Sequence, residues 1–312
     1  MRRTFGLLCL ACLFSCGSVE VVRGPFTRGN ELYDDGDLQG AEREYLLALA
    51  SKPKDAKIHY NLALTYHDLY HRDVEAERPE PAAVWLKKAE ASYMRVLELD
   101  PGNARAVTAM AVLRADQGDR DGAITWLQDA KLSDATGAAA PQWTLGCLLR
   151  DQGDEAAAMQ AFERALDDEP GHYEATTALV DLLIRQGRYD EADERLDQAA
   201  KTHKFSFGLR RQRTEVAVHR ARLTPADRQA WHAVILRANP ALGMVPDHRQ
   251  LNEWVSEAHQ ARGENELALR HLWTARDAAS DEGLRRDGLK PEVWRAGVER
   301  RLRELHARLG RP

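Results

Sequence analysis

The sequence has few of the residues that build β-sheets or flexible linkers. β-branched residues are sparse, and the 12 prolines and 21 glycines of the 312 residues gather into no linker that would divide the chain. Alanine, leucine, arginine, glutamate and aspartate dominate, and these residue types favour helices over strands. The length exceeds that of one ordinary compact domain. The composition therefore predicts an all-α protein and favours a repeat array.

The sequence also lacks an excess of positive charge and the motifs of common catalytic sites. Its formal charge is −5, and it becomes −7 if the two arginines Arg2 and Arg3 are removed with an N-terminal signal. This charge predicts no electrostatic attraction to nucleic acid. The sequence contains no glycine-rich phosphate loop, no nucleophile-elbow motif and no convergent set of polar residues. We therefore expect no enzyme activity, no cofactor and no small-molecule substrate.

The strongest catalytic alternative is the histidine pair His67 and His71, with Asp68 between them. Two histidines one helical turn apart can share one metal ion, and an intervening acid can act as a base, as in the zinc-protease motif. Asp68 stands where that motif has glutamate, and only generic acids such as Glu75 could supply a third ligand. Solvated histidines explain the pair more simply. We predict no metal site, and a metalloenzyme is the least favoured alternative.

Residues 1–15 have the pattern of a signal peptide. Arg2 and Arg3 precede an apolar run from Phe5 to Phe14, which is too short to span a bilayer but suits a secretory signal. The run ends at Leu13-Phe14-Ser15-Cys16-Gly17-Ser18, which resembles the lipobox of bacterial lipoproteins. The resemblance implies cleavage before Cys16 and acyl chains such as palmitate on that cysteine. Residues 16–24 then form a tether, and an ordinary secretory signal is the alternative.

The other residues near the signal refine the expected location. Gly17 does not resemble the aspartate that retains lipoproteins at the inner membrane, so the resemblance implies the outer membrane, facing the periplasm. Cys9 and Cys12 lie in the segment to be removed, which leaves Cys16 and Cys147 of the 4 cysteines. Because Cys16 is expected to be acylated, no structural disulfide is predicted.

The chain repeats with a period of about 34 residues. Glycines recur at the predicted turns between paired helices, and each is followed five residues later by an alanine. These pairs are Gly36 and Ala41, Gly118 and Ala123, Gly153 and Ala158, Gly187 and Ala192, and Gly263 and Ala268. The fullest unit, residues 139–172, adds Leu145-Gly146, Phe162 and Pro170. The pattern resembles the tetratricopeptide repeat. The resemblance implies a right-handed α-solenoid of stacked helix-turn-helix units, because one unit cannot bury its apolar face alone.

The repeats predict the following organisation. Residues 25–206 hold five units, with an insertion at about 67–84 in the second. Residues 207–248 fit the pattern poorly and are predicted to be an irregular helical stretch. Residues 249–282 form a further unit, and residues 283–312 hold an amphipathic C-terminal capping helix. The basic run from Arg210 to Arg213 is interpreted as a solvated helix face.

The resemblance also implies a binding groove, because the first helices of tetratricopeptide units line the concave side and hold peptides or partner helices there. The matching positions are Phe26, Asn30, Tyr33, Lys57, Tyr60, Asn61, Leu64, Arg105, Thr108, Val112, Trp143 and Arg150. Exposed aromatic residues beside polar neighbours are typical of interaction surfaces.

Two functional hypotheses follow from these patterns. The leading one is a non-catalytic adaptor, anchored by its lipid, that binds proteins and takes part in assembling a cell-envelope complex, as pilotins do. The alternative is a soluble periplasmic or cytosolic co-chaperone in which Asn30, Asn61 and Arg105 form a partial carboxylate clamp. Phe26 and Ala109 stand where that clamp has a lysine and an arginine. Two charge-assisted hydrogen bonds of the clamp would therefore be missing.

Overall fold

The structure is a computed structural model that describes residues 23–130 and 139–311. Over these ranges the chain forms 16 helices and no strand, which confirms the all-α prediction. The predicted signal peptide and the lipid-bearing Cys16 lie outside the described residues, as do residues 131–138. None of the described helices is both long enough and apolar enough to cross a membrane.

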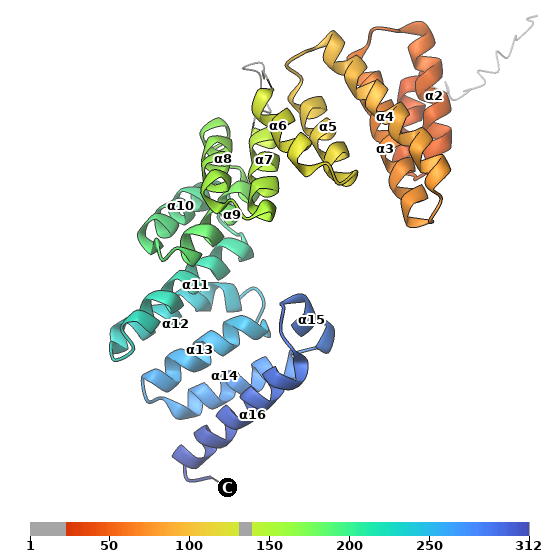
Figure 1. The fold of residues 1–312 in the computed structure, drawn as a ribbon. Helices are drawn as coiled ribbons and strands as arrows, with labels where there is room; N and C mark the ends of the chain where they lie inside the picture. Colours follow the sequence, from red (N-terminus) through yellow and green to blue (C-terminus); the bar gives the residue numbers. More distant parts are fainter. Residues whose placement is uncertain (1–22, 131–138, 312) are drawn as a thin grey trace, which may run out of the picture. The chain divides into compact units, whose positions relative to one another are not determined.

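The chain divides into two compact units, residues 1–100 and 101–312, each built from antiparallel helices (Figure 1). The first unit contains α1 (Pro25–Asp34), α2 (Leu38–Ser51), α3 (Ala56–Glu75) and α4 (Pro79–Leu99). The second begins with α5 (Ala104–Asp116), α6 (Arg120–Asp129), α7 (Ala139–Gln152), α8 (Glu155–Asp168), α9 (Tyr173–Arg185) and α10 (Tyr189–Thr202). It continues with α11 (Phe207–Leu223), α12 (Arg228–Leu242), α13 (Arg249–Ala261), α14 (Asn265–Asp277), α15 (Asp281–Arg286) and α16 (Pro291–Arg308).

The recurring Gly-Asp pair works as a helix stop followed by a helix start. The turn glycines have positive φ angles, for example 82° at Gly118 and 94° at Gly153, which favour glycine at the end of a helix. The next residue caps the following helix, as Asp119 does by accepting a hydrogen bond from the Gly122 amide. Arg188 before α10 and Glu264 before α14 stand at the corresponding position and make no such side-chain bond. The glycine is therefore common to all these turns, and the capping bond occurs where aspartate follows it.

Small residues allow the two helices of a hairpin to approach closely. A β-carbon on Gly29 of α1 would lie 2.6 Å from a ring carbon of Tyr45 on α2. At Gly146 of α7 the corresponding distance to the Phe162 ring on α8 is 2.5 Å. Both rings are buried, so each fills the space that its glycine leaves.

The insertion in the second predicted repeat lengthens both helices of the hairpin formed by α3 and α4. These helices have 20 and 21 residues, and only residues 76–78 separate them. Pro79 occupies the first turn of α4, where a missing amide hydrogen does no harm. Asp73 is buried and accepts hydrogen bonds from Arg78 at 2.5 Å and from the Trp85 indole at 2.9 Å. The Asp73 carboxylate at the end of α3 therefore links the turn residue Arg78 to Trp85 on α4.

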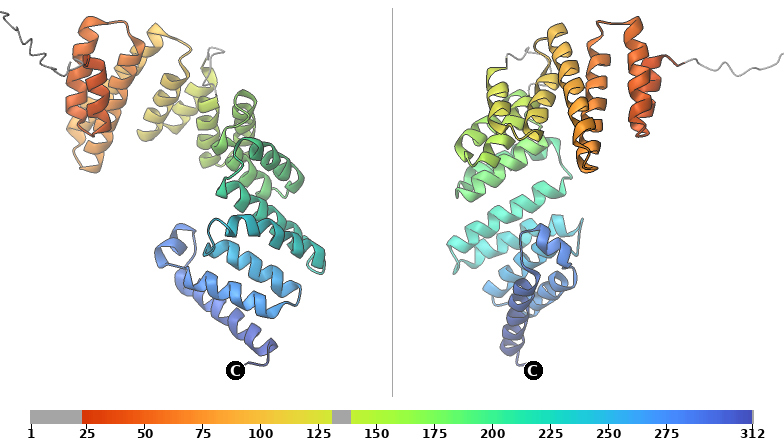
Figure 2. Two further views of the ribbon diagram at one scale, coloured as in Figure 1. Left: turned by 180° about the vertical axis from the view of Figure 1, so that it is seen from behind. Right: turned by 45° about the vertical axis from the view of Figure 1, so that its right-hand side comes forward.

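Residues 207–248 contain the helices α11 and α12, with Pro240 inside α12 near its end. Trp231 and Val234 of α12 belong to a core cluster with Leu251 and Val255 of α13. The helices from α11 to α14 lie side by side in successive order (Figures 1 and 2). The stretch therefore continues the stack of hairpins in the second unit.

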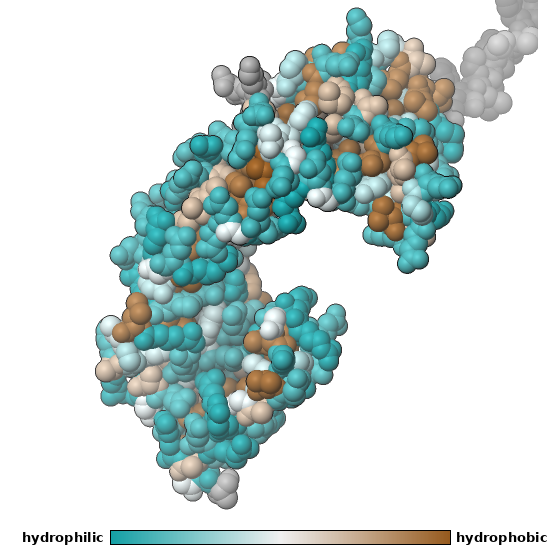
Figure 3. Space-filling view, in the orientation of Figure 1, coloured by the Kyte–Doolittle hydropathy of each residue, from teal (hydrophilic) through white to brown (hydrophobic). Residues whose placement is uncertain are grey.

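The last long helix, α16, covers the apolar side of α14. Val298, Leu302 and Leu305 are buried against Leu269 and Leu272 of α14. The short helix α15, which the sequence pattern does not predict, packs on α16. Hydrophilic residues predominate on the face of the molecule in Figure 3. The C-terminal helix thus closes the second unit, because a repeat stack needs a polar outer surface at its end.

Candidate functional site

A pocket in the first unit lies among α1, α2 and α3. Its cavity has a volume of about 280 Å³ and is lined by Asn30, Tyr33, Asp34, Tyr45, Asn61 and Leu64. Four of these residues were predicted to belong to the binding groove. The volume lies just below the range of about 300–1,000 Å³ that is typical of drug-sized ligands. The pocket therefore has the size for one side chain of a partner.

Two asparagines and a tyrosine form the floor of this pocket. The Tyr45 hydroxyl donates to the side-chain oxygen of Asn30 at 2.8 Å, and the Asn61 amide nitrogen donates to the same oxygen at 2.9 Å. One oxygen thus fixes side chains from α1, α2 and α3. An amide has two lone pairs on its oxygen and two N–H donors, so the Asn61 oxygen and the Asn30 amide nitrogen remain as groups that can bind a ligand.

Tyr33 forms a second hydrogen-bonded link between α1 and α3. Its hydroxyl donates a short hydrogen bond to the carboxylate of Asp68. Burial, and then the bond to Asp68, raise the pKa of Tyr33 far above its usual range. Burial also raises the pKa of Tyr45, and the nearby Asp34 carboxylate acts in the same direction. Both phenols therefore stay neutral at physiological pH, in surroundings of negative charge.

The other predicted groove residues of the first unit lie on α1 and α3. Phe26 packs on Tyr45 with ring centroids 6.0 Å apart. Tyr60 packs on Tyr93 of α4 with a centroid distance of 6.1 Å. Lys57 is exposed one helical turn before Asn61. All seven predicted groove residues of the first unit thus lie on α1 or α3, the first helix of each hairpin, and four of them line the pocket.

The predicted groove residues of the second unit lie on α5 and α7. On α5, Arg105 is exposed and Val112 is half-buried, while the Thr108 hydroxyl donates to the backbone oxygen of Ala104 at 2.8 Å. On α7, Trp143 stacks on His172 with a centroid distance of 6.0 Å. Arg150 pairs with the adjacent Asp151 at 3.0 Å. Whether these five residues bind a partner stays a prediction.

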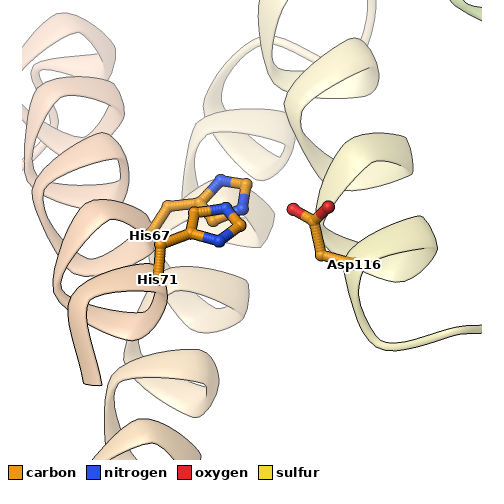
Figure 4. Close-up of side chains that lie close together, drawn as sticks. All are labelled: His67, His71 and Asp116. Atoms are coloured by element: carbon orange, nitrogen blue, oxygen red, sulfur yellow. The ribbon is translucent and has the colours of Figure 1, made fainter. Parts of the chain in front are cut away.

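His67 and His71 project from the same face of α3, and their rings stack with centroids 4.8 Å apart (Figure 4). His67 is buried, and its Nδ1 atom lies 3.5 Å from the Tyr93 hydroxyl of α4. His67 is therefore a packed residue, whereas the sequence suggested a solvated one. Two imidazoles are one ligand fewer than the three protein ligands of a catalytic zinc site.

Sequence reasoning missed a polar row on α11 and α13 of the second unit. Arg222 of α11 makes a two-pronged contact with Glu257 of α13, with N–O distances of 2.9 and 2.7 Å. Arg211 pairs with Glu215 one turn along α11 at 3.0 Å. Burial raises the pKa of the Glu215 carboxyl. The spacing of four residues between Arg211 and Glu215 was the available signal, whereas the partner on the next repeat was not visible in the sequence.

Comparisons with known proteins agree with this architecture. Family models for tetratricopeptide repeats match residues 29–69 and residues 149–206. No curated protein sequence matches the chain.

Solved structures with a similar fold include PilF of Pseudomonas aeruginosa, which is 18% identical. This match covers 75% of the present chain and 96% of PilF, with a TM-score of 0.52. MamA is 22% identical over 56% of this chain and 94% of its own, with a TM-score of 0.41. A thermophilic tetratricopeptide repeat protein of Thermus thermophilus is 20% identical over 51% of this chain and 80% of its own, with a TM-score of 0.43.

Gly29 and the Gly36 turn lie within the first matched range, the Gly153 and Gly187 turns lie within the second, and Gly146 stands just before it. The similarity to PilF shows the fold and nothing finer. The chain is an all-α solenoid protein that contains tetratricopeptide repeats.

Proposed function

We propose that this protein is a non-catalytic scaffold that binds other proteins and is held at a bacterial envelope membrane by a lipid on Cys16. The pocket of the first unit is the observation that carries the protein-binding part. Tetratricopeptide repeats generally bind protein partners, and this pocket offers two amide groups, two phenols and an apolar side chain. These groups sit on three helices that hydrogen bonds hold in place, so little order is lost when a partner binds.

The pattern of residues 1–16 supports the anchoring part. An apolar run that ends in a lipobox-like segment is the signal for acylation of the cysteine. Two or more acyl chains give stable membrane attachment, because each buried methylene contributes about 0.8 kcal/mol. The proposed location is the outer membrane, facing the periplasm, and the proposed process is the assembly of an envelope complex.

Fractionation of cells tests the anchor. The wild-type chain should sediment with membranes, and mass spectrometry of its N-terminal peptide should find acyl chains on Cys16. Cys16→Ser should move the protein to the soluble fraction. Cys147→Ser is the matched control, because Cys147 lies on α7 in the described part of the chain, and it should leave the protein on the membrane. A membrane-bound Cys16→Ser protein without acyl chains would contradict the anchor.

Affinity capture from solubilised membranes tests the protein-binding part. The wild-type chain should retain a defined partner, and Asn61→Ala should lose it, because this change removes a ligand-binding amide from the pocket. Asn239→Ala is the matched control, since Asn239 is exposed on α12 of the second unit. Capture that is equal for all three chains would exclude the pocket as the binding site.

A further inference from the structure

The pocket of the first unit carries negative charge and no positive charge. Asp34 is the only ionisable acid or base among the lining residues apart from the two phenols, and its side chain is exposed to solvent. Asp68 lies directly behind Tyr33, whose hydroxyl it binds. Lys57 stands one turn before Asn61 and is not part of the lining. The lining therefore contains no lysine or arginine that could hold a carboxylate.

The C-terminal end of α1 adds to the negative electrostatic potential of the pocket. Tyr33 and Asp34 are the last two residues of α1, and the last turn of that helix contains no basic residue. The carbonyl ends of a helix carry roughly half a negative elementary charge, which stabilises cations placed there. Acidic residues are disfavoured at such an end because they are repelled. The C-terminal end of α1 therefore combines the carboxylate of Asp34 with the negative end of the helix dipole, and its last turn holds no basic residue. A bound cation would reduce the repulsion between these two negative groups.

The residues that line the pocket also suit a long side chain with a positively charged end. Tyr33 and Leu64 are half-buried and present a phenol and an aliphatic group to the cavity, and the buried Tyr45 lies at its floor. Aromatic faces attract cations, and aliphatic groups pack against the stem of a long basic residue. The Asn61 oxygen adds a hydrogen-bond acceptor, because the Asn61 nitrogen is the group that binds Asn30. The raised pKa of Tyr33 reflects burial first and then Asp68, and the raised pKa of Tyr45 reflects burial, with Asp34 acting in the same direction against a hydrogen bond to Asn61.

We propose that this pocket binds the guanidinium group of an arginine side chain presented by a protein partner. The inference rests on the proposed function and names the chemistry of the partner at that site. A guanidinium group has five donors in one plane, so it can bind the Asp34 carboxylate and the Asn61 oxygen together while it stacks on a phenol. A lysine ammonium is a point charge and offers neither the fork nor the stacking plane.

This assignment differs from a carboxylate clamp. In a clamp, basic side chains and asparagine amides hold the C-terminal carboxylate of the partner. Here the Phe26 ring packs on Tyr45 where such a base would stand, and Asp34 would repel a carboxylate. The two ligands carry opposite charges, so one titration distinguishes them.

The test is an NMR titration of the full chain that follows the side-chain amide signals of Asn30 and Asn61. The probes are N-acetyl-arginine amide, its neutral isostere N-acetyl-citrulline amide, N-acetyl-lysine amide and N-acetyl-alanine with a free carboxylate. Arginine should give saturable shifts, and citrulline should bind at least about tenfold more weakly, which corresponds to about 1.4 kcal/mol. Lysine should fall between the two, and the carboxylate should produce no saturable shift.

Two variants with the same change of charge complete the test. Asp34→Asn should weaken arginine binding about tenfold. Asp35→Asn should leave it within about twofold, because Asp35 is the neighbouring exposed acid outside the pocket lining. Equal effects of the two variants would show a general field and overturn the assigned site. Binding of the carboxylate in place of arginine would also overturn it. If affinity capture succeeds while arginine fails, the scaffold stands and only this inference is wrong.

Discussion

Replacement of Gly146 by alanine tests the close packing of α7 on α8 with one added carbon. A β-carbon there would lie 2.5 and 2.6 Å from two carbons of the Phe162 ring, which is fully buried. Overpacking of this kind costs about 1–3 kcal/mol, because the ring or a helix must move. Alanine in place of a helical glycine contributes about 1 kcal/mol in the opposite direction. We therefore expect Gly146→Ala to lower the free energy of unfolding by about 1 kcal/mol.

Urea unfolding followed by far-ultraviolet circular dichroism measures this effect. Gly297→Ala is the matched control, because Gly297 lies inside α16 and an added β-carbon would meet no atom within 4 Å. That change should raise the stability by about 0.5–1 kcal/mol. In a Phe162→Leu background the penalty at Gly146 should shrink, since the smaller side chain gives the new methyl group room. Equal stabilisation by both alanines would refute the packing argument.

Two other changes test the buried polar contacts. Asp73→Ala should lower the free energy of unfolding by about 1–3 kcal/mol in a urea titration, because it removes the buried acceptor shared by Arg78 and Trp85. Replacement of the exposed Glu75 by alanine should change this free energy by less than about 0.5 kcal/mol. Equal effects of the two replacements would contradict the role of Asp73. Burial lowers the pKa of His271 from 6.5 to about 4. Below pH 6.5 the unfolded chain therefore binds a proton that the folded chain excludes, and thermal stability should fall between pH 6.5 and pH 4. His271→Gln should flatten this pH dependence, and an unchanged slope would show that another group titrates.

The sequence was sufficient to predict the hairpins, because each turn depends on adjacent residues. Gly153 takes a φ angle of 94° and Asp154 caps α8, so two letters encode both the end of one helix and the start of the next. The pairing of Gly146 with Phe162 follows from the repeat pattern in the same way. Such contacts lie within one repeat, where helical geometry fixes which residues meet.

The contacts between different repeats were harder to predict from the sequence. The period shows that Asn30 and Asn61 share a face, but not that they bond to one another and to Tyr45. The length of α3 and α4 was equally hidden, because Pro79 can either break a helix or begin one. Arg222 and Glu257 meet only because α11 and α13 pack side by side. Such long-range pairs depend on the side-chain geometry of the folded stack.

Site-specific photo-cross-linking in intact cells tests whether the pocket face of the first unit binds a protein partner. A benzoylphenylalanine residue replaces Lys57, an exposed residue of α3 next to the pocket, or Leu47, which is 55% exposed on α2. We expect a discrete cross-linked protein partner from position 57, its loss when Asp34→Asn is added, and no such product from position 47. The same product from both positions, or none from position 57, would contradict a scaffold that binds its partner through this face.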